Sequence, residues 1–157
     1  VFAETQTKGR GTHGRKWISV NGNFFASIFF PLKKNFPPFN EFSIINPVIV
    51  SNIVKYYCKK KISFKWPNDL FINKKKICGI LQEHITSDEK TFLVVGIGIN
   101  VAKNPSINDQ YETTSIFLES KKKPQINEII NLTVSYYEKF FSNLDTYNYA
   151  NYKKKII

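Results

Sequence analysis

The stretch Phe92–Val101, FLVVGIGINV, combines a run of apolar residues with glycines at positions 96 and 98. A continuous apolar run of this length is typical of a strand buried in a sheet. Because side chains alternate along a strand, Gly96 and Gly98 fall on the same face and leave a slot through which a ligand can approach the backbone. The same spacing also fits a bulge or a closely packed helix, and the residues alone leave this choice open.

Further strands are predicted on both sides of this stretch. Five other segments have the alternation, or the β-branched and aromatic residues, that are typical of strands. They are residues 1–5, 24–32, 61–65, 69–73 and 76–84. Residues 24–32 predict a central strand that ends at Pro31. The last two segments predict a hairpin around the turn Asn73-Lys74-Lys75.

Two segments have the spacing of amphipathic helices. Apolar residues at 42, 45, 49, 53, 54 and 57 predict a helix from Asn40 to about Lys60, which either starts near Pro47 or kinks there. Pro124 opens a second helix, whose apolar positions are 126, 129, 130, 134, 137, 141 and 144. Strands combined with two separated helices predict an α+β fold, a mixed β-sheet with helices packed on one face, in a single domain over residues 1–157.

The composition fits a globular domain that attracts anions. The net charge is +11 and 42% of the residues are hydrophobic, which indicates acidic partners without choosing among nucleotides, nucleic acid, acidic proteins and membrane surfaces. We interpret the lysine triplets at 59–61, 74–76, 121–123 and 153–155 as solvated turns or helix ends, apart from Lys76. No apolar run approaches the roughly 20 residues of a membrane span, and the two cysteines lack metal-ligand spacing, so we expect no membrane association and a reducing, cytoplasmic location. The sequence begins with Val and contains no Met, which suggests a fragment.

Both arginines of the chain lie in one segment, Gly9-Arg10-Gly11-Thr12-His13-Gly14-Arg15-Lys16-Trp17, and all other cationic residues are lysines. A guanidinium suits a phosphate or a carboxylate better than an ammonium does, and glycines let backbone N–H groups approach an anion. The segment therefore predicts an anion-holding loop, with a solvated basic loop as the alternative. A dinucleotide fingerprint is rejected because no helix follows and residues 30–40 hold no acid. A P-loop is rejected because Arg15-Lys16 replaces Lys-Ser/Thr.

Two more segments carry candidate chemistry. In Lys65-Trp66-Pro67-Asn68-Asp69, Pro67 restricts the backbone, so that Asn68 and Asp69 project together from a turn and could read a polar ligand or hold Mg²⁺. The alternative is an ordinary turn in which both side chains cap their own backbone. Lys76 begins the apolar strand KICGIL, where a partly desolvated ammonium could bind a carboxylate or phosphate, or simply end a solvated turn.

Taken together, these segments resemble the catalytic domain of biotin–protein ligases. Four blocks match in order, and the resemblance covers about residues 1–145: Gln6 to Trp17, Lys65 to Leu70, Lys76 to Glu83 and Gly96 to Val101. The resemblance implies a class II synthetase-like fold and a two-step reaction. Biotin and MgATP would give biotinyl-adenylate, and a lysine of a biotin carboxyl carrier protein would then accept the biotinyl group. No protein nucleophile is needed for such a sequence of steps.

The resemblance also implies roles for individual residues. Lys76 and Arg10 would be catalytic, acting on the carboxylate and α-phosphate. Residues implied in biotin and adenylate binding are Gln6, Gly9, Arg10, Gly11, Thr12, Trp17, Lys76, Gly79, Gly96 and Gly98, with the last three forming a floor against the biotin ring and Trp17 packing near adenine. Asn68, Asp69 and Asn100 would meet the nucleotide and its metal. No resident metal is implied beyond the Mg²⁺ that accompanies ATP.

The sequence departs from the family pattern in the glycine-rich loop and at its ends. The family pattern is Gly-Arg-Gly-Arg-Arg-Gly-Arg, and Thr12-His13 replace the middle arginines, which predicts weaker retention of the adenylate. A Ser/Thr-rich element before the first strand, a helix-turn-helix and a C-terminal β-barrel do not appear in this sequence. The alternatives are a non-catalytic biotin- or nucleotide-binding remnant, a lipoate ligase of the same fold, and a basic nucleic-acid-binding module, which the placement of the aromatic residues disfavours. The resemblance to biotin–protein ligases is also compatible with a homodimer.

Overall fold

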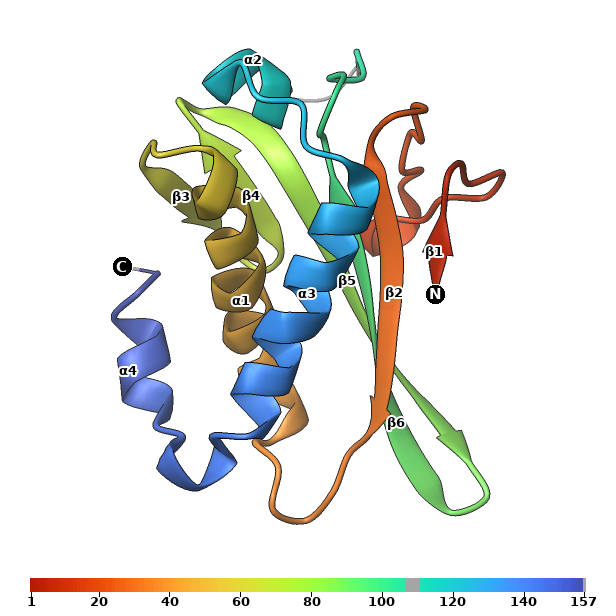
Figure 1. The fold of residues 1–157 in the computed structure, drawn as a ribbon. Coiled ribbons are helices and arrows are strands. Elements are labelled where there is room, and N and C mark those ends of the chain that lie inside the picture. The colour runs from red at the N-terminus through yellow and green to blue at the C-terminus, as the bar shows by residue number, and fades with distance from the viewer. Residues whose placement is uncertain (107–110, 157) are drawn as a thin grey trace.

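A computed structural model describes residues 1–106 and 111–156 and shows a six-stranded sheet in the order β1-β2-β6-β5-β4-β3 (Figure 1). The strands are β1 Phe2–Ala3, β2 Phe24–Pro31, β3 Ile62–Lys65, β4 Asp69–Ile72, β5 Lys75–Ser87 and β6 Lys90–Ile99. Every pair of neighbouring strands is antiparallel. Parallel pairing among the described residues is limited to an isolated bridge between Lys76 and Thr113, which lies outside the named strands. The sheet is therefore antiparallel and not mixed as expected.

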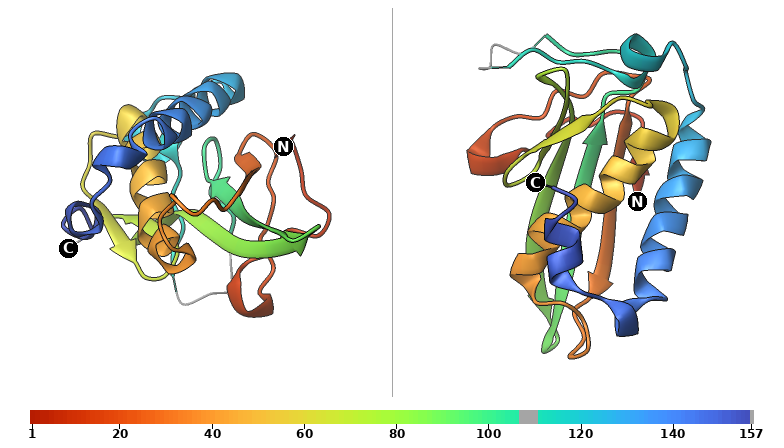
Figure 2. Two further views of the ribbon diagram at one scale, coloured as in Figure 1. Left: turned by 90° about the horizontal axis from the view of Figure 1, so that it is seen from below. Right: turned by 90° about the vertical axis from the view of Figure 1, so that its left-hand side faces the viewer.

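The helices gather on one face of the sheet, as the fold prediction requires (Figure 2). They are α1 Phe42–Tyr57, α2 Ile116–Ser120, α3 Ile126–Phe141 and α4 Tyr149–Lys153, with 3₁₀ turns at Thr12–Gly14, Phe39–Glu41 and Leu144–Thr146. Helices α1 and α3 lie side by side along the strands, and the core is formed between them and the sheet. The opposite face carries the N-terminal segment, and no helix of the four described packs on it, which leaves room for a site.

Helix α1 begins at Phe42, so Pro47 lies inside the helix rather than at its start. Each of the six apolar positions predicted for this helix is buried. Pro47 removes one backbone donor from the helix, but burial of Ile45, Val48 and Ile49 around it holds the turn in place. The alternative start near Pro47 is therefore wrong, because tertiary packing overrides the local preference of proline.

Six of the seven apolar positions predicted for helix α3 lie in the core or pack against it. Its buried residues are Ile129, Thr133, Tyr137 and Phe140, whereas Val134 is 48% exposed. Thr133 is accommodated in the core because its hydroxyl donates to the Ile129 carbonyl at 2.6 Å. The pattern at 126–144 identified the helix but assigned Val134 to the wrong face, since a polar residue with an internal hydrogen bond replaced it.

A buried polar relay joins both helices to the sheet. The Tyr137 hydroxyl donates to Asn46 Oδ1 at 3.0 Å, and Asn46 Nδ2 donates to Gln82 Oε1 at 2.9 Å. Gln82 in turn donates to the Phe39 carbonyl at 3.0 Å. These bonds satisfy polar groups that would otherwise be costly inside the core, and they fix α1 and α3 relative to β5.

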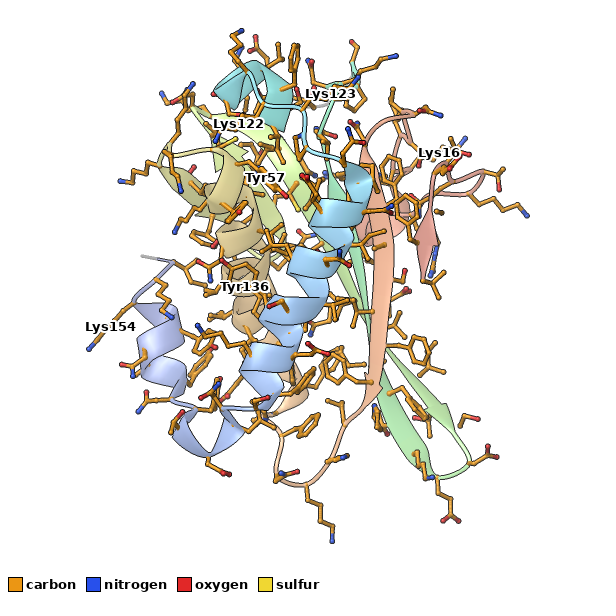
Figure 3. The ribbon with its side chains drawn as sticks, in the orientation of Figure 1. Lys16, Tyr57, Lys122, Lys123, Tyr136 and Lys154 are labelled. Carbon is orange, nitrogen blue, oxygen red and sulfur yellow. The ribbon has the colours of Figure 1, made fainter. Side chains whose placement is uncertain are left out.

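Several smaller predictions can be compared with the structure. The hairpin of β4 and β5 turns at Asn73 and Lys74, which have φ of 51° and 64°, as a two-residue type I′ turn requires. Strand β2 is not central, because its outer neighbour β1 is only two residues long. The lysine triplets are exposed apart from Lys76, and the labelled lysines of Figure 3 lie on the outside of the ribbon. Cys58 and Cys78 are both buried and free.

Candidate active site

The open face of the sheet presents rows of small side chains, because directly opposed residues on antiparallel strands point to the same side. One row runs from Phe25 through Gly98 and Gly79 to Asp69. The next row contains Ser27, Gly96 and Leu81. The predicted alternation of Gly96 and Gly98 is therefore confirmed, and the two glycines lie in adjacent rows.

The arginine-containing loop folds as a small hairpin over this face. Gly11 N–H donates to the Arg15 carbonyl at 2.7 Å, and Trp17 N–H donates to the Gly9 carbonyl at 2.9 Å. At the tip, His13 and Gly14 have φ of 56° and 73°, a left-handed conformation that glycine adopts without strain. This loop, which the sequence predicts to hold an anion, thus folds as a flap over the glycine rows.

The indole of Trp17 lies directly on two of the three floor glycines. A Cβ built on Gly79 would lie 2.4 Å from Trp17 Cζ3, and one built on Gly98 would lie 2.5 Å from Trp17 Cε2 and Cζ2. At Gly96 the nearest atom to such a Cβ is Leu81 Cβ at 3.6 Å. The expected slot is therefore divided, since Trp17 covers Gly79 and Gly98 and only Gly96 has no ring against it.

Lys76 pairs with Asp69 at the edge of the glycine rows. Its Nζ is 2.8 Å from Asp69 Oδ2, and the two side chains are only 18% and 17% exposed. The same Nζ lies 5.3 Å from the centre of the Trp17 ring. The backbone of Lys76 is held by the Glu112 carbonyl and the Thr114 N–H at 2.8 and 2.9 Å. The prediction of a partly desolvated, inward-pointing lysine is confirmed, and the alternative of a solvated turn residue is wrong.

Three buried polar atoms around this pair have no hydrogen-bond partner among the described residues. They are Trp17 Nε1, Asp69 Oδ1 and Asn100 Oδ1. Asn100 Nδ2 is used structurally, because it donates to the Thr114 carbonyl at 3.0 Å. Unpaired buried polar groups are costly unless a ligand or water satisfies them. The site therefore offers one N–H donor, two oxygen acceptors and an ammonium to a bound molecule.

Asn68 lies in the same region, but its amide has a structural partner. Asn68 Nδ2 donates to the Ile80 carbonyl at 2.9 Å, and the Ile80 N–H donates to the Asn68 carbonyl at 2.9 Å. These bonds tie the turn after the cis Trp66–Pro67 peptide to β5. The alternative in which both side chains cap their own backbone is therefore wrong, because Asn68 bonds to β5 and Asp69 turns its carboxylate toward Lys76.

A cavity of about 210 Å³ brings these residues together. It is lined by twelve of the thirteen residues that the sequence singled out: Gln6, Arg10, Gly11, Thr12, Trp17, Asn68, Asp69, Lys76, Gly79, Gly96, Gly98 and Asn100. Gly9 does not line it; a Cβ there would lie 2.5 Å from the Trp17 carbonyl oxygen, so this glycine permits close backbone packing within the hairpin.

Sequence reasoning missed other residues of the cavity wall. Glu83 accepts from Arg10 Nη1 at 3.0 Å and from Arg10 Nη2 at 2.7 Å, and Thr113 reaches the wall through its bridge to Lys76. Glu83 belongs to the strand block that the resemblance matched, but no local signal links it to a loop 73 residues away. Among the described residues, five cationic and two acidic side chains line the cavity, which favours an anionic ligand.

No helix in residues 1–106 and 111–156 combines the length and apolar character needed to cross a membrane.

The chain is similar in sequence and fold to biotin protein ligases. A biotin--[acetyl-CoA-carboxylase] ligase of Paracoccus denitrificans is 27% identical over 157 residues, which cover 96% of this chain and 65% of that protein. A biotin protein ligase from Aquifex aeolicus, solved in complex with biotin and ATP, superposes with a TM-score of 0.81 at 30% identity, covering 99% of this chain and 65% of that one. One from Leishmania major, solved in complex with biotinyl-5-AMP, gives 0.81 at 26% identity, covering 99% and 68%.

The chain spans between about a sixth and two thirds of the length of the curated relatives it matches, from 16% to 65%. The sequence profile described as the biotin/lipoate A/B protein ligase family matches residues 1–100, well over half of the chain. On this match, the chain belongs to the biotin/lipoate A/B protein ligase family.

Proposed function

We propose that residues 1–157 are the catalytic domain of a cytoplasmic, ATP-dependent biotin–[acetyl-CoA-carboxylase] ligase. The domain activates biotin as biotinyl-5′-AMP and transfers it to a lysine of a biotin carboxyl carrier protein. The observation that carries this proposal is the position of Lys76, largely buried beside Asp69 in a cavity with three unpaired polar atoms. Two structural relatives, solved with biotin and ATP and with biotinyl-5-AMP, support the same chemistry.

The first step joins two anions, so the site must offset their repulsion. The biotin carboxylate attacks the α-phosphorus of ATP, and the bond to pyrophosphate breaks. The Lys76 ammonium, fixed by Asp69 at 2.8 Å, stabilises the negative charge that develops on the α-phosphate oxygens. Arg10 supplies a second cation from the loop, and Gln6, Gly11 and Thr12 contribute polar groups on the same wall.

The reaction also involves Mg²⁺ bound to ATP, and the acceptors in the cavity fit a hard cation. Asp69 Oδ1 and Asn100 Oδ1 are oxygen atoms without a partner among the described residues, and Mg²⁺ takes oxygen ligands. Asp69 would hold the metal, and Asn100 would meet the nucleotide. The cation would neutralise phosphate charge when bound.

The second step requires that the carrier lysine can reach the bound adenylate, and it needs no further catalytic group. An uncharged ε-amine of the carrier lysine attacks the mixed anhydride, and AMP leaves as the amide forms. Because the leaving group is already activated, positioning and charge stabilisation are sufficient. Gly96 leaves room for the substrate ring, and Trp17 forms the wall over Gly79 and Gly98.

The decisive experiment is mass spectrometry of a purified biotin carboxyl carrier domain incubated with this chain, biotin and MgATP. We expect a gain of one biotinyl group on one lysine, and no gain without ATP. Lipoic acid in place of biotin is the specificity control, because a lipoate ligase of the same family would use it instead. No gain, together with calorimetric binding of biotin, would show a binding domain rather than a ligase. Absence of biotin binding as well would overturn the site assignment.

A further inference from the structure

The arginine-containing hairpin touches the sheet at two separated points on β5. At one point Trp17 packs on Gly79, and at the other Arg10 forms a bidentate pair with Glu83. Gly79 and Glu83 are four residues apart on the same face of one strand, a separation of about 13 Å. The row that contains Leu81 lies between these two contacts.

This arrangement makes the hairpin a roof over the row of Ser27, Gly96 and Leu81. All three residues line the cavity, and Gly96 is the floor glycine that Trp17 does not cover. Along β5 the Trp17 contact lies on one side of this row, and the pair of Arg10 and Glu83 lies on the other side. If the Arg10–Glu83 pair opened, the hairpin would still contact β5 through the packing of Trp17 on Gly79.

The geometry of the pair fixes the direction of the guanidinium. One N–H from each terminal nitrogen of Arg10 binds one oxygen of Glu83, at 3.0 and 2.7 Å. This end-on contact leaves the Nε–H and the remaining N–H groups of Arg10 pointing away from Glu83. Without it, an arginine on a glycine-rich loop with 69% of its side chain exposed would sample many rotamers.

We propose that Glu83 is a positioning residue of the site: it holds Arg10 across the cavity mouth and so slows the release of an anionic acyl-adenylate. The inference rests on the proposed function and extends it to a residue that does not touch the reacting atoms. It matters in this chain because Thr12 and His13 carry no guanidinium, so Arg15 is the only other arginine of the loop.

A purely electrostatic role for Glu83 predicts the opposite result. The side chain carries a negative charge into a cavity for anions, so its removal would tighten binding if charge alone mattered. If Glu83 instead aligns Arg10, its removal weakens binding, because a small misplacement of a catalytic-site donor costs much of its effect. The sign of the change in release rate therefore separates the two explanations.

The test compares Glu83→Gln, Glu83→Asp and the control Glu89→Gln, which removes an exposed carboxylate from the β5–β6 turn. Release of biotinyl-5′-AMP is followed by rapid filtration, and exchange of the amides in residues 9–17 by hydrogen-exchange mass spectrometry. We expect Glu83→Gln to speed both release and loop exchange about tenfold, Glu83→Asp to fall between it and the wild type, and Glu89→Gln to match the wild type. The melting temperature should hardly change, since exposed ion pairs contribute little to stability.

Slower release from Glu83→Gln, or unchanged exchange in residues 9–17, would overturn the positioning role. Failure of the proposed function would look different, because the wild-type chain itself would neither form nor bind biotinyl-5′-AMP. In that case the exchange comparison still decides whether Glu83 holds the loop.

Discussion

The indole of Trp17 packs so closely on Gly98 that a Cβ at this glycine would lie 2.5 Å from two of its ring carbons. The contact joins a loop near the N-terminus to strand β6. It also explains why a glycine is required at this position for structural reasons, before any ligand is considered, because the ring uses the space that a side chain would occupy.

We predict that Gly98→Ala displaces Trp17. An added methyl group in a packed contact costs about 1–3 kcal/mol, and we expect the low end because Trp17 lies on a loop that can move. The chain has two tryptophans, and Trp66 is 78% exposed. In a Trp66→Phe background, the fluorescence of Trp17 should shift to longer wavelength when Gly98 is replaced.

Gly96→Ala is the matched control for this shift. A Cβ at Gly96 would meet Leu81 at 3.6 Å, an ordinary contact, so the emission of Trp17 should stay unchanged. Equal shifts in both variants would show that Trp17 responds to the sheet in general and not to its contact with Gly98.

Lys76→Ala should leave the fold intact and remove most adenylation. Loss of the ammonium leaves the Asp69 carboxylate without its partner at 2.8 Å, at a cost of about 1–3 kcal/mol in the free energy of unfolding. The rate of pyrophosphate release should fall on the order of 100-fold or more, as for other fixed charge stabilisers. Lys75→Ala is the control, because Lys75 pairs with Glu112 and is 46% exposed. Adenylation at the wild-type rate in Lys76→Ala would remove Lys76 from the mechanism.

Thr12→Arg should slow the release of biotinyl-adenylate. Thr12 lines the cavity, and a guanidinium at its rim could add hydrogen bonds to a charged group, each contributing about 1.5–3 kcal/mol, so we expect a decrease of at least about tenfold. Thr7→Arg adds the same charge just before this segment, at a residue that does not line the cavity, and should have little effect. Equal slowing by both variants would assign the effect to net charge.

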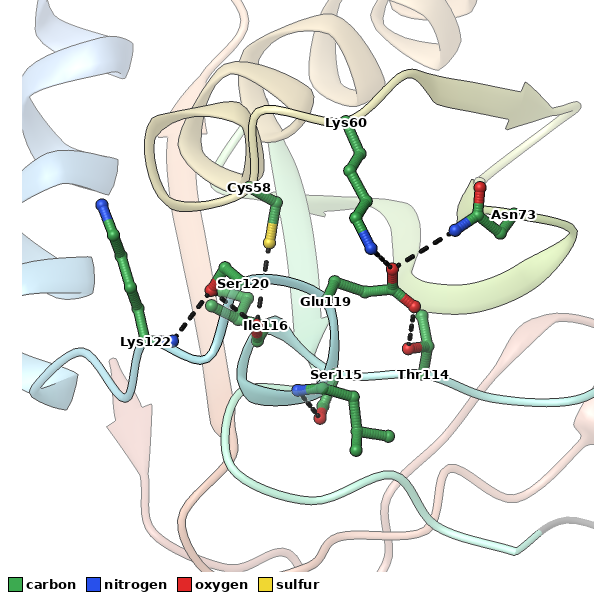
Figure 4. A network of polar contacts seen from close by, with 10 residues as sticks. Cys58, Lys60, Asn73, Thr114, Ser115, Ile116, Glu119, Ser120 and Lys122 are labelled. Carbon is green, nitrogen blue, oxygen red and sulfur yellow. Dashed lines mark hydrogen bonds and ion pairs between the residues drawn. The ribbon is translucent and has the colours of Figure 1, made fainter.

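Glu119 should make stability depend on pH in the acidic range. Figure 4 shows its carboxylate between Lys60, Asn73 and Thr114, with distances of 2.8, 3.4 and 2.5 Å. Burial raises the pKa of Glu119, but hydrogen bonds from Lys60 and Thr114 and the charges of both Lys60 and Lys75 outweigh it, so the pKa lies below its ordinary value of 4.5. The unfolded chain then binds more protons than the folded one, and the stabilisation is present above pH 4.5 and lost as pH falls through the folded pKa.

Glu119→Gln should therefore lower the free energy of unfolding near neutral pH by about 1–3 kcal/mol and flatten its decline below pH 4.5. Urea titrations at several pH values measure both effects. Glu138→Gln, on the exposed side of α3, should leave the curve unchanged. A Glu119→Gln protein with the wild-type acid slope would contradict this account.

The sequence alone was sufficient to predict the strands around Gly96 and helix α1. Strong periodicity decides these elements, because alternation with period two and an apolar helical stripe each have few other solutions. It was insufficient for the exposure of Val134 in α3 and for the place of Pro47 within α1. In both cases packing outweighed the local preference, and in α3 a hydrogen bond from Thr133 to the Ile129 carbonyl allows a polar residue in the core.

For the site, the chain determined by itself which residue types are present: a loop with both arginines, a lysine at a strand start and glycines on one strand face. Only the tertiary structure decided what each one touches. It set Trp17 on Gly79 and Gly98, paired Lys76 with Asp69, and joined Arg10 to Glu83 across 73 residues. The physical reason is that charge, size and backbone freedom are properties of single residues, whereas a contact depends on strand register and on the path of a loop, which are fixed only when the whole sheet forms.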